Sequence, residues 1–294
     1  MNGFINLLKP PGMSSGAAVA VVKRLTGEKV GHAGTLDPEA AGVLPIMVGR
    51  AARLLDYFAD KSKSYIAEIA FAGATDTQDA QGVIIQSPTR VPGREEILAV
   101  LPAFRGDILQ RPPAYSALKR DGVPLYELAR KGVEVETKAR PTVIHALELG
   151  EQTGPDGYML SVDCGSGTYI RTLCHDIGQA LDAPAHMRFL LRTRHGAFAI
   201  GNAVTIEEVI AAGEKKEIES LLLPMDFPLR PLLRLDVPEN LWKLARNGGK
   251  LPAEILPEAK ENAPLRVYAD GALLGVAHRA GSVIRFDVGL TGGQ

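Results

Sequence analysis

Residues 31–44 read GHAGTLDPEAAGVL, a glycine-rich stretch that holds one histidine, His32, and one aspartate, Asp37. Its glycines permit tight backbone geometry around a substrate. A loop that carries ionisable side chains between glycines is more often functional than a plain connector. Asp37 followed by Pro38 also fits the start of a helix, with Asp37 as the N-cap. Spacing alone therefore leaves a functional loop and a helix cap both open.

Outward from this stretch, apolar periodicity predicts an alternation of strands and helices. The predicted strands span residues 4–8, 64–72, 142–150 and 158–164, and the predicted helices span residues 15–25, 50–59, 95–104 and 169–181, with another starting at the capping box of residues 205–208. Residues 73–82 are predicted to form a polar loop. Residues 105–140 carry eight Lys or Arg against five Asp or Glu and few apolar runs. That composition is typical of a locally positive insertion rather than of core.

The C-terminal part of the chain has a different pattern. Residues 224–231 are rich in proline and lack periodicity, so we expect a domain boundary there, between a domain of residues 1–228 and one of residues 229–294. The second domain holds a predicted helix over residues 241–246 and short strands over residues 265–268, 273–277 and 283–288. Short strands separated by glycine turns favour a small β-barrel.

Composition restricts the class of protein. Apolar residues make up 46% of the 294 positions, which is enough for a sizeable core. The formal net charge is −1, so RNA or DNA binding would have to use local basic faces. There are two cysteines, Cys164 and Cys174, and a reducing compartment is the simplest interpretation. With neither a secretory signal nor a membrane-spanning apolar run in the sequence, a cytoplasmic protein is expected.

Several short motifs match a chemistry only in part. Residues 12–16 (GMSSG) fit the GxSxG pattern of a nucleophilic serine, but at the extreme N-terminus Ser14 and Ser15 are better helix caps. Residues 165–167 (GSG) lack the third glycine of a dinucleotide fingerprint. The sequence holds neither a phosphate-binding P-loop nor paired CxxC spacing, so we expect neither nucleotide cofactor nor metal.

The stretch GHAGTLDPEAAGVLPIMVGRAARL, residues 31–54, resembles the catalytic signature of the TruB family of pseudouridine synthases. Four further segments resemble family motifs in the same order, namely KSY at residues 63–65, TDTQDAQG at 75–82, RPPAYSALK at 111–119 and GTYIRTL at 167–173. The resemblance runs from about Phe4 to the boundary near Pro228. Glu39 and Ala41 depart from the common pattern, at positions to which the family assigns no chemistry.

The resemblance implies an α+β fold, with a mixed, mainly antiparallel sheet and flanking helices (the pseudouridine synthase fold), followed by a PUA-like RNA-binding β-barrel. It also implies the isomerisation of a uridine to pseudouridine in the T-loop of tRNA, at position 55. This reaction breaks an N-glycosidic bond, turns the uracil and rejoins it through carbon, so it needs a carboxylate but neither redox chemistry nor a cofactor. Asp37 is implied as that carboxylate.

The resemblance assigns roles to five more residues. Arg171 is implied to pair with Asp37 and to favour its ionised form. The target uridine must be flipped out of a folded loop, and the residues implied to bind it are His32, Tyr65, Tyr169 and Leu190, with Tyr65 also placed among the catalytic residues. Without the motifs, Tyr65 and Leu190 are ordinary core residues, His32 a loop histidine and Arg171 a surface arginine.

Partners follow from the same resemblance. The expected partner is tRNA, bound at its T-arm and elbow region. The protein is expected to be a monomer that needs neither a membrane nor a small-molecule cofactor. Candidate phosphate contacts are Arg188, Arg192 and Arg194, together with Lys119, Arg120, Arg130 and Lys131 of an RNA-gripping thumb loop. Solvated surface charge is the competing interpretation for each. A non-catalytic RNA-binding or tRNA-folding factor and a serine hydrolase at Ser14 are the alternatives.

Overall fold

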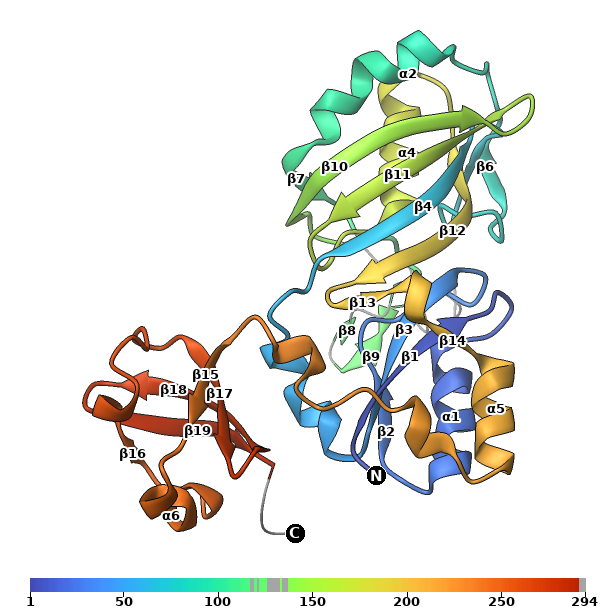
Figure 1. Cartoon of the computed structure of the whole chain (residues 1–294). Coiled ribbons are helices and arrows are strands. Elements are labelled where there is room, and N and C mark those ends of the chain that lie inside the picture. The colour runs from blue at the N-terminus through green and yellow to red at the C-terminus, as the bar shows by residue number, and fades with distance from the viewer. Residues whose placement is uncertain (117–118, 121, 126–132, 134–136, 291–294) are drawn as a thin grey trace.

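A computed structural model of the chain describes residues 1–116, 119–120, 122–125, 133 and 137–290, and its largest element is a ten-stranded sheet (Figure 1). The strands of this main sheet are β1 (Gly3–Lys9), β2 (Val30–His32), β3 (Ala41–Val48), β4 (Lys63–Ala70), β7 (Gly106–Gln110), β10 (Arg140–Gln152), β11 (Gly157–Cys164), β12 (His186–His195), β13 (Phe198–Ala199) and β14 (Val204–Thr205). They follow the order β14-β1-β3-β12-β4-β11-β10-β7, with β2 beside β3 and β13 beside β12. The pairs β1–β14 and β3–β12 are parallel and the others antiparallel, which confirms the predicted mixed, mainly antiparallel sheet.

Two central strands were not predicted from the sequence. β3 is buried along nearly its whole length, as expected for a strand covered on both faces. β12 lies between β3 and β4 and joins the two halves of the sheet. The predicted polar loop at residues 73–82 begins with a short hairpin strand, since β5 (Ala74–Thr75) pairs with β6 (Ile84–Gln86).

Helices cover the two halves of the sheet separately. They are α1 (Ser15–Thr26), α2 (Arg94–Val100), α4 (Ile170–Ala180) and α5 (Ile206–Glu214), whereas α6 (Trp242–Arg246) belongs to the C-terminal part of the chain. The side chain of Ser14 caps α1 by accepting a hydrogen bond from the Ala17 amide at 3.1 Å. α1 contacts α5 and β2, and α5 contacts β1 and β14, whereas α4 contacts β12 and β4 and is packed against α2 (Figure 1). Within the described residues, none of these helices has both the length and the apolar character that crossing a membrane requires.

Short 3-10 helices supply most of the remaining turns. They are η1 (Gly49–Tyr57), η2 (Leu101–Phe104), η3 (Ile200–Asn202), η4 (Ile218–Leu221), η5 (Phe227–Leu229), η6 (Glu239–Leu241) and η7 (Ala253–Ile255). The amphipathic helix predicted over residues 50–59 is therefore a 3-10 helix, with Ala51 and Leu54 buried.

The predicted insertion over residues 105–140 begins later than expected. Residues 106–110 form β7, which pairs with the start of β10 at the edge of the main sheet. Beyond it, β8 (Lys119–Arg120) pairs with β9 (Val123–Pro124) in a separate hairpin. The sequence obscured β7 because its outer face is exposed, and only Gln110 of its five residues is buried.

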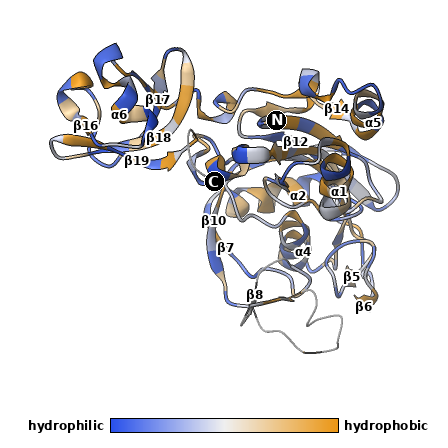
Figure 2. Cartoon of the chain, turned by 90° about the horizontal axis from the view of Figure 1, so that it is seen from below, coloured by the Kyte–Doolittle hydropathy of each residue, from blue (hydrophilic) through white to orange (hydrophobic). Residues whose placement is uncertain are grey.

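The C-terminal residues form a second, curled five-stranded sheet, which lies to one side of the main sheet in both views (Figures 1 and 2). Its strands, in the order β15-β17-β18-β19-β16, are β15 (Leu233–Asp236), β16 (Leu251–Pro252), β17 (Pro264–Ala269), β18 (Ala272–Ala280) and β19 (Val283–Gly289). Its core includes Leu235, Val267 and Ile284. This half-barrel is consistent with the predicted PUA-like domain.

A further apolar cluster joins the two sheets. Phe4, Phe58 and Phe198 of the main-sheet part share this cluster with Val276 and Leu290 from the C-terminal strands and their end. The predicted boundary at residue 228 lies in η5. The division of the chain there into two functional domains stays a prediction.

Candidate active site

Asp37 lies in the loop between β2 and β3, and no helix begins there. The Ala40 amide donates to the Asp37 carbonyl at 3.1 Å and closes a turn at Pro38 and Glu39. The interpretation of Asp37 as a helix N-cap is therefore wrong, and the carboxylate is available for other contacts.

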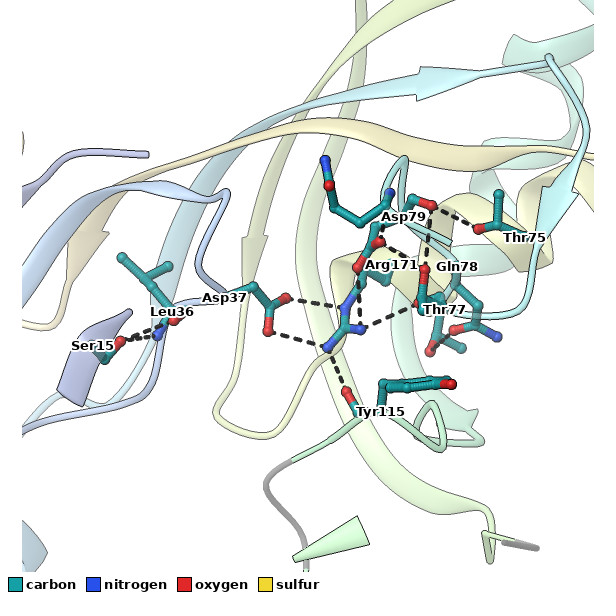
Figure 3. A network of polar contacts seen from close by, with 11 residues as sticks. Ser15, Leu36, Asp37, Thr75, Thr77, Gln78, Asp79, Tyr115 and Arg171 are labelled. Atoms are coloured by element: carbon teal, nitrogen blue, oxygen red, sulfur yellow. Dashed lines mark hydrogen bonds and ion pairs between the residues drawn. The ribbon is translucent and has the colours of Figure 1, made fainter. Parts of the chain in front are cut away.

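Buried contacts from the N-terminal elements hold this loop in place. The Ser15 hydroxyl accepts from the Leu36 amide and donates to the Leu36 carbonyl, both at 2.9 Å (Figure 3). Ser15 is 2% exposed and stands at the start of α1. The residue immediately before Asp37 is thus fixed by a side chain that the sequence marked only as a cap.

Lys9, at the end of β1, fastens the other side of the loop. Its ammonium donates to three backbone carbonyls, those of Pro10 at 2.7 Å, Met13 at 2.6 Å and Pro38 at 3.0 Å. The residue is 0% exposed, and burial lowers the pKa of Lys9 to about 8, against the opposing pull of Glu39 and Asp37. Asp37 therefore lies between two anchored residues, Leu36 and Pro38.

Arg171, the second residue of α4, pairs with Asp37 through both carboxylate oxygens. Its Nε lies 3.0 Å from Oδ2 and its Nη2 lies 3.2 Å from Oδ1 (Figure 3). Such a forked contact fixes the plane of the carboxylate. Burial raises the pKa of the Asp37 carboxyl above its ordinary value, while Arg171 opposes this rise and favours the ionised form.

A second carboxylate, Asp79, contacts the same arginine. Its Oδ2 lies 3.3 Å from Nη1 of Arg171, which also donates to the Thr77 carbonyl at 3.2 Å. Asp79 is held in turn, since its Oδ1 accepts from the Thr77 hydroxyl at 2.7 Å and from the Gln81 amide at 3.0 Å. Nη2 of Arg171 further donates to the Tyr115 carbonyl at 2.9 Å. The TDTQDAQG segment was quoted as a motif, but its spacing did not reveal that Asp79 meets Arg171.

Asp37 and Arg171 open onto a pocket with a volume of about 280 Å³, near the lower end for small-ligand sites. Three predicted substrate-binding residues, Tyr65, Tyr169 and Leu190, line it. Tyr65 and Leu190 are each 7% exposed and stand on the adjacent strands β4 and β12. Burial raises the pKa values of Tyr65 and Tyr169, so both phenols stay protonated near neutral pH.

The buried side chain of Gln110 holds Tyr169 in place. Its Oε1 accepts from the Tyr169 amide at 3.0 Å and its Nε2 donates to the Tyr169 carbonyl at 3.3 Å. Because Tyr169 immediately precedes α4, this reciprocal pair also sets the start of the helix that carries Arg171. No sequence motif indicated this contact, because Gln110 lies within the predicted insertion.

The fourth predicted binding residue, His32, is placed differently. It stands on β2 and is absent from the residues that line the pocket. Its Nδ1 is buried and has no hydrogen-bond partner in the described part of the chain. Burial, together with Arg192, lowers the pKa of His32.

The three arginines on β12 are engaged within the protein and do not form a free basic patch, and their role as phosphate contacts stays a prediction. Arg188 pairs with Glu68 at 3.0 Å and Asp156 at 2.8 Å, and Arg194 pairs with Asp60 at 2.9 Å and Asp163 at 3.0 Å. Arg192 is 1% exposed, so none of the three is a free surface cation. The acids come from distant segments, which is why the local sequence suggested a positive surface. In the thumb, Arg130 and Lys131 lie outside the described residues, as do the side chains of Lys119 and Arg120.

The two cysteines and Gly167 of the partial motifs lie in the packed structure or at a turn. Cys164 and Cys174 are buried and unbridged, and burial raises the pKa of Cys164 to about 11. Gly167 precedes α4 with a φ of 88°. Across the described ranges, histidine, cysteine and acidic side chains do not gather in groups of three or more that could hold a metal.

Two family models match the chain. The TruB family pseudouridylate synthase (N terminal domain) matches residues 23–170, and the tRNA pseudouridylate synthase B C-terminal domain matches residues 171–230. Among curated relatives, the tRNA pseudouridine synthase B of Alkaliphilus oremlandii is 43% identical over 257 residues, which covers 87% of this chain and 85% of that protein. The protein of the same name from Clostridium perfringens strain SM101 is 39% identical over 284 residues, which covers 95% of each.

Solved structures share the fold. A chain of a Cbf5–Nop10–Gar1 complex matches with a TM-score of 0.75 at 26% identity, covering 98% of this chain and 84% of that one. A chain of an H/ACA RNP bound to a substrate RNA containing 2'-deoxyuridine matches with a TM-score of 0.74 at 23% identity, covering 99% and 85%. At such low identity the second match speaks for the fold alone.

Proposed function

The chain belongs to the TruB family of pseudouridylate synthases, and from that premise we propose which group performs its reaction and which uridine it takes. It is an enzyme that isomerises uridine to pseudouridine in tRNA. We propose that Asp37 is the catalytic carboxylate and that the substrate is the T-loop uridine at position 55. The observation that supports this assignment is the forked pairing of Asp37 with the buried Arg171, both of which line the pocket.

The proposed role of Asp37 follows from what isomerisation demands. The glycosidic bond has to break and a carbon–carbon bond has to form, and a carboxylate serves either as nucleophile or as a base in such chemistry. A carboxylate facing RNA phosphates is repelled unless it is paired. Arg171 supplies that pairing and keeps the oxygens in one plane.

The pocket is proposed to receive a single flipped uridine. Unstacking a base costs a few kcal/mol, which contacts inside the site must offset. Tyr65 and Leu190 supply apolar surface for the uracil, and Tyr169 closes the wall near Arg171. Tyr65 is proposed to be a catalytic residue as well, because it lines the same pocket as Asp37. His32, on β2 just before the Asp37 loop, is proposed to contact RNA beside the flipped nucleotide.

The remaining proposals concern binding. We propose that a monomer binds the T-arm and elbow of tRNA, that residues 111–135 act as a thumb, and that residues 229–294 form an RNA-binding domain that reaches the acceptor end. No cofactor enters this scheme, because the isomerisation is redox-neutral and needs no energy input. We also propose that the enzyme works in the cytoplasm.

Release of hydrogen from uracil C5 tests the assignment directly. Plain mass spectrometry does not, because the product has the same mass as the substrate. Tritium release is followed from C5-labelled tRNA and from a T-arm hairpin. Wild type should release tritium from both, Asp37→Asn should release none, and Glu39→Gln, an exposed acid in the same loop, should behave as wild type. Activity in Asp37→Asn would remove Asp37 from the chemistry. Undiminished release from tRNA whose T-loop uridine is replaced by cytidine would refute the proposed target.

A further inference from the structure

Two cations line the pocket together with Asp37 but take no part in the scheme above. Lys63 is the first residue of β4, two positions before Tyr65, and Arg192 lies on β12 directly across from Tyr65. Both are thus built into the sheet beneath the site. Their charges face the space in which a nucleotide is proposed to bind.

Neither cation is paired with an acidic side chain among the described residues. No described carboxylate lies within 4.0 Å of Lys63 or Arg192, whereas Arg188 and Arg194 on the same strand are each paired with two. Arg192 instead donates from Nε to the Val43 carbonyl at 2.7 Å and from Nη2 to the Gly34 carbonyl at 2.9 Å. Neutral carbonyls fix its position but leave its charge uncompensated.

Lys63 uses fewer of its hydrogen-bond donors than Arg192 does. The one hydrogen bond described for its ammonium is a long one, 3.3 Å to the Lys61 carbonyl, although an ammonium carries three donors. Burial and the neighbouring Arg192 lower the pKa of Lys63, against the opposing pull of Cys164 and Asp60. An anion that entered the pocket would reverse that effect.

Gly34, in the loop that carries Asp37, leaves room for side chains beside the pocket. Gly34 has a φ of 70°, and a Cβ there would lie 3.1 Å from Cε1 of His195 and 3.4 Å from Cε of Lys63. A side chain at this position would therefore press on His195 and occupy space beside Lys63. The glycine keeps open the space between the catalytic loop and the cations.

We propose that Lys63, supported by Arg192, forms an anion subsite that binds a backbone phosphate next to the flipped uridine. The inference rests on the proposed function, because it takes RNA as the ligand of this pocket. A phosphodiester matches the site, since it brings one negative charge and acceptor oxygens to an ammonium with unused donors. Held at one phosphate, the nucleotide is fixed relative to Asp37 at a point remote from its base.

The test combines protein variants with RNAs that lack one charge. T-arm hairpins carry a neutral methylphosphonate at the phosphate on the 5′ or on the 3′ side of the target uridine, and Kd is measured by equilibrium binding. Wild type should bind one of these about tenfold more weakly than the unmodified hairpin, the order expected for one charge-assisted hydrogen bond. Lys63→Met should bind the unmodified hairpin about tenfold more weakly and be insensitive to that same methylphosphonate.

Matched variants complete the experiment. Lys61→Met removes an exposed lysine of the adjoining loop and should keep the sensitivity of wild type. Lys63→Arg should restore most of the binding, and Lys63→Gln serves if the methionine variant does not fold. Equal losses on charged and neutral hairpins in the Lys63 variants, or full affinity in all of them, would overturn the subsite.

This outcome is separable from failure of the proposed function, because Kd does not depend on turnover. If wild type released no tritium but showed the coupling between Lys63 and one phosphate, the subsite would stand and the assigned reaction would fall. If wild type released tritium without that coupling, the reaction would stand and the subsite would be wrong.

Discussion

Nη1 of Arg171 lies 3.3 Å from Oδ2 of Asp79, so the guanidinium that orients Asp37 is shared with a second carboxylate from the loop after β5. The arginine thus has one acid on each side of its fork. The position of Asp37 depends on this loop as well as on its own, because Asp79 fixes the group to which Asp37 binds.

Asp79→Asn should therefore impair the reaction through Arg171, and not through a contact between Asp79 and the substrate. We expect kcat to fall about tenfold, because a loosened Arg171 displaces the reacting carboxylate. Asp79 also raises the pKa of Asp37, so its removal should move the acid limb of the pH–rate profile to lower pH. Steady-state tritium release measured over pH 4–8 gives both the fall in kcat and the shift of the acid limb.

Asp76→Asn is the matched control for this loop. Asp76 is exposed and accepts from the Val83 amide at 2.8 Å, away from Arg171. Its variant should keep both the rate and the acid limb of wild type. An unchanged profile in Asp79→Asn would show that Arg171 does not need its second acid.

Ser14 and Ser15 form a natural pair of variants. Ser14→Ala removes the cap of α1 and should lower the free energy of unfolding by about 1 kcal/mol with activity retained. Ser15→Ala leaves the buried Leu36 amide and carbonyl without a partner, so kcat should fall by about tenfold or more as the Asp37 loop shifts. Thermal denaturation and tritium release separate the two effects. A large loss of activity in Ser14→Ala would instead revive a role for that hydroxyl.

The sequence predicted much of the sheet and the central pair of the site. The strands β1, β4, β10 and β11 follow from local periodicity, and the motifs placed Asp37 with Arg171. β12 was missed because its arginines look like surface charge in the local sequence, and their partners Glu68, Asp156 and Asp163 come from β4, the turn before β11 and β11. The contact of Asp79 with Arg171 spans 92 positions of the chain, and no periodicity encodes such a pairing.

Gly42 should be the least replaceable glycine of the catalytic stretch. Its φ is 119°, and a Cβ there would lie 2.2 Å from the Arg192 carbonyl oxygen, so Gly42→Ala forces β3 and β12 apart. We expect several kcal/mol of destabilisation and little folded protein, of the order seen for overpacked and strained sites. Gly12→Ala also has a positive φ, 77°, but meets nothing within 4 Å and should lose about 1 kcal/mol. Urea denaturation of both variants tests the contrast, and similar losses would contradict it.

Lys9 should make stability depend on pH in a predictable direction. Burial lowers its pKa from 10.5 to about 8 in the folded protein, so between these pH values the unfolded chain holds more protons than the folded one. The free energy of unfolding must then rise with pH across this window, by up to about 3 kcal/mol for a shift of this size. Below pH 8 both states carry the proton and the contribution is constant.

Comparison with Lys9→Met isolates this effect, because all other titrating groups are common to both proteins. At pH 7 the variant should already be less stable by about 1–3 kcal/mol, since the carbonyls of Pro10, Met13 and Pro38 lose their donor. From pH 8 to 10.5 the stability advantage of wild type over the variant should widen, as wild type gains from the early loss of its proton. Urea denaturation at closely spaced pH values gives the difference directly. A constant difference over that range would mean that Lys9 keeps its ordinary pKa, and that its three carbonyl contacts compensate fully for burial of the charge.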